Sequence, residues 1–252
     1  MGEKIDFNDY INLFNCGRPI REMSPLNNQT YKVFMMSNID IRVIDRETCI
    51  AKLCRCSQLE RFTADTKTRS RRYFYVIPIQ TPSGDYVGFV YRALFDHGYM
   101  SVLRPFNDIS KKVPYMFGFY KDFETYNLYT DRAKTCMPIV VCEGAKDAIM
   151  LKSLYPYVVS NNTSSLGLNA YVISNITDKV LLAYDNDETG HEQSPKDKSI
   201  LTNLGCSVDI LKYDKGFKDA ADYFNHPTEL KALKRQMTQR IKGLINGVTL
   251  AL

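Results

Sequence analysis

The stretch IVVCEGAKDA, residues 139–148, decides how the C-terminal half of the chain is organised. Its first four residues are apolar and mostly β-branched, which is the composition of a strand buried on both faces. Glu143-Gly144 follows directly, and residues 145–154 then have the apolar spacing of a helix. A buried strand that leads into a helix predicts one unit of a parallel sheet.

Downstream, the chain repeats this alternation of short apolar strands and helices. We expect strands at residues 158–160, 180–183 and 208–211, and helices at residues 168–176, 194–204 and 220–224. The expected fold class is therefore α/β, with a Rossmann-like parallel sheet flanked by helices and preceded by a smaller basic α+β subdomain.

The N-terminal half has a different pattern. Residues 73–79 and 86–93 predict two strands of a hairpin. Between them lies TPSGD, residues 81–85, a turn sequence in which proline presets φ and glycine accepts a positive φ. Residues 7–15 fit an amphipathic helix.

The last part of the chain predicts an amphipathic helix with a basic polar face. Its apolar face would carry Leu230, Leu233, Met237, Ile241 and either Leu244 or Ile245. Such a helix either packs on the domain with its charges in solvent or docks nucleic acid or a partner protein. We expect three parts in all: residues 1–135, residues 136–225 and the C-terminal helix at 226–252.

Composition narrows the function only slightly. The 252 residues carry a net charge of +5, which is compatible with a polyanionic partner without requiring one. The seven cysteines have no regular spacing, which favours a reducing compartment over a disulfide framework. No apolar run reaches the length of a membrane span, so we expect a cytoplasmic protein without a membrane partner.

Acidic residues follow the ends of three expected strands. They are Glu143, then Asp185 and Asp187 in one loop, and then Asp219 with Asp222. Parallel strands bring their carboxyl ends to one edge of a sheet, where ligands bind. Carboxylates gathered there repel one another, and a divalent cation relieves that repulsion. Oxygen ligands suit Mg²⁺ or Mn²⁺, and two such ions serve phosphoryl transfer.

Each acidic segment has a simpler interpretation when taken alone. Glu-Gly after a strand is more often a helix cap than a ligand, and Asp219 alone would serve as the N-cap of the helix after it. The joint order is more specific: strand then Glu-Gly-x-x-Asp, strand then Asp-x-Asp-x-x-Gly, then Lys-Asp-x-x-Asp.

These segments resemble the motifs of Toprim domains. IVVCEGAKDA, residues 139–148, is similar to the family's first motif, and LLAYDNDETG, residues 181–190, resembles its second. The resemblance implies that Glu143 is a general acid/base or metal-site residue and that Asp185 and Asp187 hold the metal. KDAAD, residues 218–222, resembles a third acidic segment of phage primases and implies that Asp219, and also Asp222, contribute to the metal site.

The upstream region resembles the catalytic core of DnaG-type primases. The similar segments are RRYFYVIPI at residues 71–79, GDYVGFVYR at residues 84–92 and YMFGFYK at residues 115–121. The resemblance covers residues 70–224 and implies a DNA primase that makes short RNA primers on single-stranded DNA from nucleoside triphosphates. Binding of template or triphosphate is expected from Arg71, Arg72, Arg92, Arg104, Lys112, Lys146 and Lys218.

Two other functions remain open from the residues alone: a metal-dependent nuclease of the Toprim type, and a non-catalytic DNA-binding accessory protein of replication. Neither a zinc-binding domain nor a Gly-x-x-x-x-Gly-Lys-Ser/Thr motif is recognisable. We therefore expect either a replicative helicase or other replication protein as partner, or relaxed choice of start site. The small size and the KDAAD segment suggest a phage protein acting in the bacterial cytoplasm.

Overall fold

The computed structural model describes residues 137–161 and 163–247, apart from the side chains of Phe224 and Asn225. Before residue 137 it describes the backbone of five strands and no side chains. The chain divides into two compact units, residues 1–80 with 85–112, and residues 81–84 with 113–252. No helix in the described part of the chain is both long enough and apolar enough to cross a membrane.

The first unit contains an antiparallel sheet in the order β1-β2-β3-β4-β5. Its strands are β1 (Arg18–Pro19), β2 (Lys52–Arg55), β3 (Tyr73–Gln80), β4 (Tyr86–Ala93) and β5 (Met100–Leu103). The hairpin of β3 and β4 confirms the two strands expected there, and its register pairs Ile77 with Val90. The turn at 81–85 and the helix expected at 7–15 lie outside the described residues.

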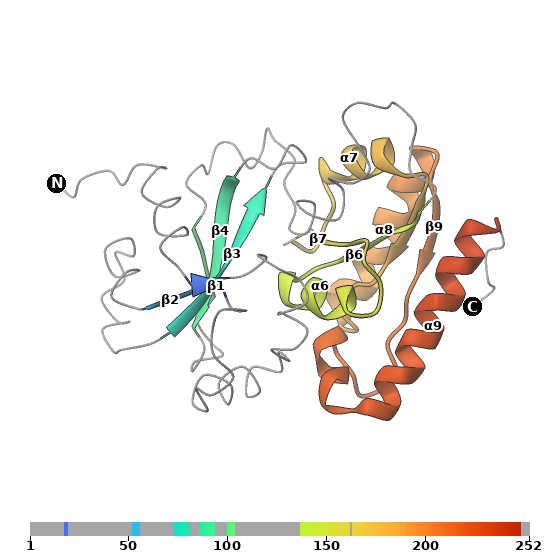
Figure 1. Ribbon diagram of the computed structural model, residues 1–252. Coiled ribbons are helices and arrows are strands. Elements are labelled where there is room, and N and C mark those ends of the chain that lie inside the picture. Colours follow the sequence, from blue (N-terminus) through green and yellow to red (C-terminus); the bar gives the residue numbers. More distant parts are fainter. Residues whose placement is uncertain are drawn as a thin grey trace. The chain divides into compact units, whose positions relative to one another are not determined.

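The second unit is built on a parallel sheet in the order β7-β6-β8-β9 (Figure 1). Its strands are β6 (Ile139–Cys142), β7 (Val158–Ser160), β8 (Lys179–Leu182) and β9 (Ser207–Ile210). The connecting helices are α6 (Ala145–Lys152), α7 (Asn169–Ile176) and α8 (Glu188–Asn203), followed by a 3-10 turn η5 (Ala220–Asn225) and α9 (Pro227–Ile245). This arrangement confirms the expected α/β class.

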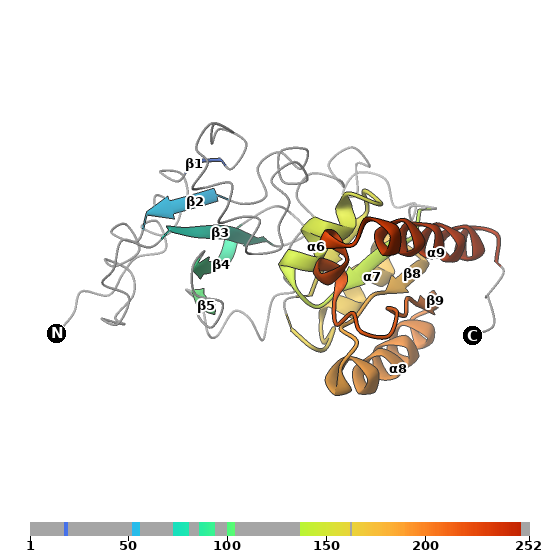
Figure 2. The same cartoon turned by 90° about the horizontal axis from the view of Figure 1, so that it is seen from below.

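Side chains alternate between the two faces of the sheet, so each face has its own core. On one face, Val180 and Leu182 of β8 pack into a cluster with Ile173 of α7 and Leu201 of α8. The opposite face is covered by α6 and α9, which contact the strands, and η5 contacts both helices (Figure 2). Burial on both faces explains why all four residues of β6 are apolar.

Helix α8 begins six residues before the start expected from the sequence. The structure starts it at Glu188, directly after Asp187, whereas apolar spacing predicted a start at residue 194. The first two turns expose mostly polar side chains, so they carry no apolar period. The start signal is the cap instead: the Asp187 carboxylate accepts a hydrogen bond from the Gly190 N–H at 3.0 Å.

Helix α9 is part of the folded unit. Its apolar face is buried through Leu233, Met237, Ile241 and Leu244, while Ile245 is 43% exposed, which decides between the two residues left open above. The same face carries Arg240, whose Nη1 lies 2.9 Å from both carboxylate oxygens of Asp209 in β9. Asp209 is almost completely buried, so this ion pair is largely shielded from water.

We predict that Arg240→Ala destabilises the protein by about 3–5 kcal/mol, because it leaves the buried Asp209 charge without its partner. Arg235→Ala is the matched control, since Arg235 is exposed on the same helix and its loss should change stability by less than about 0.5 kcal/mol. Urea denaturation of both variants measures the difference. Equal effects would show that α9 is not held by the Asp209 pair.

Candidate functional site at the carboxyl edge of the parallel sheet

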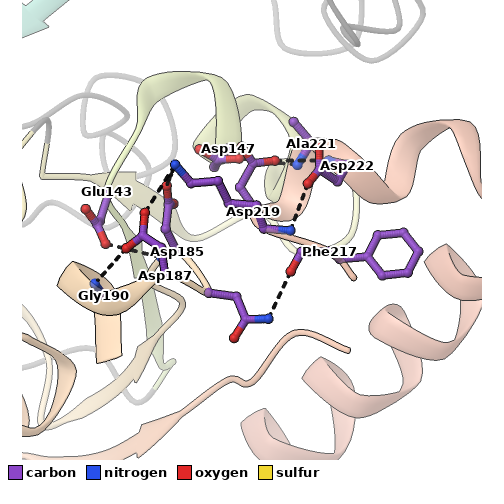
Figure 3. Close-up of polar contacts among 11 residues, drawn as sticks. Glu143, Asp147, Asp185, Asp187, Gly190, Phe217, Asp219, Ala221 and Asp222 are labelled. Atoms are coloured by element: carbon purple, nitrogen blue, oxygen red, sulfur yellow. Dashed lines mark hydrogen bonds and ion pairs between the residues drawn. The ribbon is translucent and has the colours of Figure 1, made fainter. Parts of the chain in front are cut away.

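The carboxyl ends of β6 and β8 bring the first two acidic segments together. Glu143 follows β6 directly, and its Oε1 accepts a hydrogen bond from the backbone N–H of Asp185, just beyond β8, at 3.2 Å (Figure 3). The two strands are hydrogen-bonded neighbours in parallel register. Residues that are 42 positions apart in the sequence are therefore in direct contact.

Asn186 links the second acidic segment, which contains Asp185 and Asp187, to the third by hydrogen bonds. The Asn186 N–H donates to the carbonyl of Lys218 at 2.6 Å, and its side-chain amide donates to the carbonyl of Phe217 at 3.0 Å. The Asn186 side-chain oxygen lies 2.8 Å from Nε2 of His191, one turn into α8. Asn186 thus links the loop after β8 to the loop before η5 through its backbone and its side chain.

Asp147 belongs to this cluster although it was not among the candidate site residues. It lies in the first turn of α6, is 6% exposed, and accepts a hydrogen bond from the Ala221 N–H at 3.2 Å. The segment Glu-Gly-x-x-Asp carries the signal, because four residues after Glu143 is one helical turn. The fold therefore adds a buried carboxylate beside the half-buried Asp185 and Asp219.

Gly190 allows α8 to start against the loop that carries Asp185. A Cβ atom at position 190 would lie 2.0 Å from the Asp185 carbonyl oxygen and 3.1 Å from Oε1 of Glu143. No side chain fits that space without moving the Asp185 backbone. The glycine of the Asp-x-Asp-x-x-Gly segment thus serves close approach of backbone to backbone.

Burial and like charge raise the pKa of three carboxyl groups in the cluster. The pKa of Glu143 rises to about 7, mainly through burial and then through the charge of Asp185. The pKa of Asp185 rises to about 6, through burial and then the charge of Asp219. Burial and then Asp219 also raise the pKa of Asp147. The cluster therefore carries more negative charge than its surroundings compensate.

The pKa of Asp187 moves the opposite way. The N–H of Gly190 lowers it, because the hydrogen bond favours the charged carboxylate. Its other oxygen, Oδ2, lies 3.1 Å from the ammonium of Lys218, which also lies 3.7 Å from Oδ2 of Asp185. Lys218 is 59% exposed at its side chain, so this cation reaches the acidic pair from solvent.

Asp219 and Asp222 make local hydrogen bonds. The Asp219 side chain accepts from the Asp222 N–H at 3.0 Å and caps η5, as expected for Asp219 taken alone. The Asp222 carboxylate accepts from the Lys218 N–H at 2.8 Å. Within residues 137–161 and 163–247, no three acidic, cysteine or histidine side chains form a ready-made metal site as they stand.

The expected basic residues fall into two groups. Lys146, in the first turn of α6, and Lys218 lie in the described second unit, and Lys146 is half-buried. The side chains of the other five lie outside the described residues: Arg71, Arg72, Arg92, Arg104 and Lys112.

The chain is similar to known proteins in sequence over part of the second unit and in fold over most of its length. Residues 140–224 match the family model Toprim_2, described as Toprim-like. A DnaG primase catalytic domain solved with single-stranded DNA aligns over 92% of this chain and 77% of its own, with a TM-score of 0.65 and 17% identity. No curated protein sequence matches the chain.

Two further primase structures have the same fold. The zinc-binding and RNA polymerase domains of the Aquifex aeolicus primase align over 94% of this chain and 62% of theirs, at 20% identity and a TM-score of 0.60. The RNA polymerase domain of the Mycobacterium tuberculosis primase DnaG aligns over 92% and 82%, at 17% identity and a TM-score of 0.60. The chain therefore contains a Toprim-like domain and has the fold of DnaG-type primase catalytic cores.

Proposed function

We propose that this chain is a primase core that joins ribonucleotides into short RNA primers on a single-stranded DNA template. The observation that carries the proposal is the contact between Glu143 and the Asp185 loop at the carboxyl edge of a Toprim-like sheet. Parallel sheets bind ligands at this edge, and a nucleotidyl transfer needs acidic residues there. The fold shared with primase catalytic cores favours polymerisation over the hydrolysis of a nuclease.

The acidic cluster fits a divalent cation. Its carboxyl groups are pushed towards protonation by burial and by one another, and Lys218 already brings one positive charge to Asp185 and Asp187. Hard oxygen donors favour Mg²⁺ or Mn²⁺. Asp185 and Asp187 would hold the ion, with Asp219 and Glu143 next to them and Asp222 further along the loop. Such an ion supplies Lewis-acid stabilisation of charge on transferring phosphoryl oxygens.

Glu143 is suited to proton transfer. Its Oε1 is occupied by the Asp185 N–H, which leaves Oε2 as the atom that would exchange a proton with a reacting hydroxyl. General bases work best when their pKa lies near the operating pH, and burial raises the pKa of Glu143 to about 7. We assign Glu143 the role of proton acceptor and Asp185 and Asp187 the role of holding the reacting phosphates through the cation.

Basic residues would bind the polyanionic substrates. Lys146 and Lys218 lie in the unit that carries the acids and would contact the triphosphate, while Arg71, Arg72, Arg92, Arg104 and Lys112 would contact the template. A replicative helicase or another replication protein is the proposed partner, and phage replication in the bacterial cytoplasm the proposed setting. The three parts proposed for the chain remain residues 1–135, 136–225 and 226–252.

Primer synthesis tests the proposal directly. With single-stranded DNA, ribonucleoside triphosphates and Mg²⁺ or Mn²⁺, the wild-type protein should make short labelled RNA. Asp185→Asn/Asp187→Asn should lose at least about a hundredfold of this activity, because the lost charge interactions amount to several kcal/mol. Asp178→Asn, at the amino end of β8, is the matched control and should keep it.

Two results would contradict the proposal. Shortened template without new RNA, lost in the double variant, would identify a nuclease. DNA binding that persists in the double variant, with no turnover by the wild type, would identify a binding protein.

The charge cluster predicts an unusual pH dependence of stability. Glu143 and Asp185 have folded pKa values of about 7 and about 6, above the ordinary 4.5 and 3.8, so the folded state binds more protons in this window. Stability of the metal-free protein should therefore fall as the pH rises from about 4 to about 7. Asp185→Asn should be more stable than wild type at neutral pH in EDTA, as measured by thermal unfolding.

The exposed Ser199 of α8, which has no titratable group, provides the control for this measurement, since Ser199→Ala should leave the pH dependence unchanged. Addition of Mg²⁺ at neutral pH should raise the melting temperature of wild type and not that of Asp185→Asn/Asp187→Asn. If Asp185→Asn destabilises the metal-free protein, the carboxylates do not repel one another as described.

Gly190→Ala should abolish primer synthesis, because the added methyl group has to displace the Asp185 carbonyl and, with it, the metal-holding side chain. The melting temperature should also fall, since overpacking typically costs about 1–3 kcal/mol. Ser199→Ala, on the exposed side of α8, is the control and should retain activity and stability. Full activity of Gly190→Ala would contradict the close approach between α8 and the Asp185 loop.

A further inference from the structure

Helix α9 exposes a band of positive charges. The band consists of four exposed side chains, Lys231, Lys234, Arg235 and Lys242. At 3.6 residues per turn they fall within an arc of about 100°, and at 1.5 Å per residue they extend for about 16 Å. We call this band the α9 basic stripe. The buried apolar side chains of α9 occupy a separate arc of the helix, whose centre is about 110° away from that of the stripe.

The charges of the stripe have no acidic counterpart. None of its four side chains takes part in an ion pair with any residue in the part of the chain that the structure describes. The single acidic residue of α9, Glu229, falls outside the arc of the stripe. Arg240, by contrast, faces the sheet and pairs with Asp209. Four cations are therefore held on one side of a helix whose apolar face is buried.

We propose that the α9 basic stripe binds the phosphate backbone of a nucleic-acid duplex, such as the hybrid of template and new primer. The inference rests on the proposed function, which makes a nucleic acid the polyanion that this protein meets. A membrane surface fits less well, because α9 buries its apolar face against the sheet and leaves only Ile245 exposed for insertion.

The composition of the stripe favours a duplex over a single strand. Proteins that hold single strands combine positive charge with aromatic side chains on which bases stack, and α9 contains no aromatic residue. A duplex presents one negative charge for about every 1.7 Å of its axis, twice the density of one strand, along a stiff line. A rigid helix with four cations on one side can contact several phosphates of such a duplex at once, and it would do so without recognising the base sequence.

The test measures binding by fluorescence anisotropy with the full chain in EDTA, which excludes turnover. The probes are a labelled RNA–DNA hybrid and the matching single-stranded DNA, each titrated over a range of salt concentrations. The variant is Lys234→Gln/Arg235→Gln. The control is Lys196→Gln/Lys198→Gln, which removes the same charge from α8 on the other face of the sheet.

The stripe variant should bind the hybrid about tenfold more weakly at low salt, and its salt slope should fall by nearly 2, one for each lost phosphate contact. Single-strand binding should change by less than about twofold, and the control should bind both probes like wild type.

Unchanged hybrid binding in the stripe variant would overturn the proposal. An equal loss in the α8 control would do so too, because it would reflect net charge alone. An equal loss for the single strand would overturn the preference for a duplex. Because these measurements involve no metal and no synthesis, their failure is separate from a failure of the primer assay.

Discussion

Mutual repulsion among one buried and several half-buried carboxylates is the constraint on which the rest of the second unit depends. Glu143, Asp147 and Asp185 all have raised pKa values because the fold takes them out of water and beside one another. Placing carboxylates close together and partly out of water costs free energy of folding, so stability alone does not explain the arrangement. A divalent cation at the proposed site would relieve this repulsion, so the contacts that cost free energy in the metal-free protein would contribute to the affinity for the ion.

The surrounding structure holds this unfavourable cluster in place without neutralising it. Asn186 fastens two loops through backbone carbonyls, and Gly190 lets α8 begin where its first N–H groups face Asp187. Lys218 offers a single positive charge on a long, exposed side chain that can move away. Backbone N–H groups thus hold one oxygen of Glu143 and one of Asp187. The second oxygen of each is open to a ligand once Lys218 moves off Asp187.

Much of the second unit could be predicted from sequence because its strands are short apolar runs and its acids directly follow them. That pattern alone predicts that Glu143 and Asp185 meet at one edge of the sheet, and their contact confirms it. The predicted start of α8 was wrong because its first turns are polar, and only the Asp187 cap marks them. The Glu-Gly-x-x-Asp spacing places Asp147 one turn beyond Glu143, but no local pattern predicts its contact with Ala221, 74 positions away. The same holds for the contact of Asn186 with Phe217, 31 positions away.

Nucleotidyl transfer by this chain would need a divalent cation at the acidic edge of the sheet. Anomalous diffraction from crystals of the protein soaked in Mn²⁺ and a ribonucleoside triphosphate would locate such an ion. We expect an anomalous peak in contact with the carboxylates of Asp185 and Asp187, with triphosphate oxygens beside it and Lys218 moved off the pair. Ordered triphosphate without a peak at these carboxylates, or a peak elsewhere, would contradict this expectation.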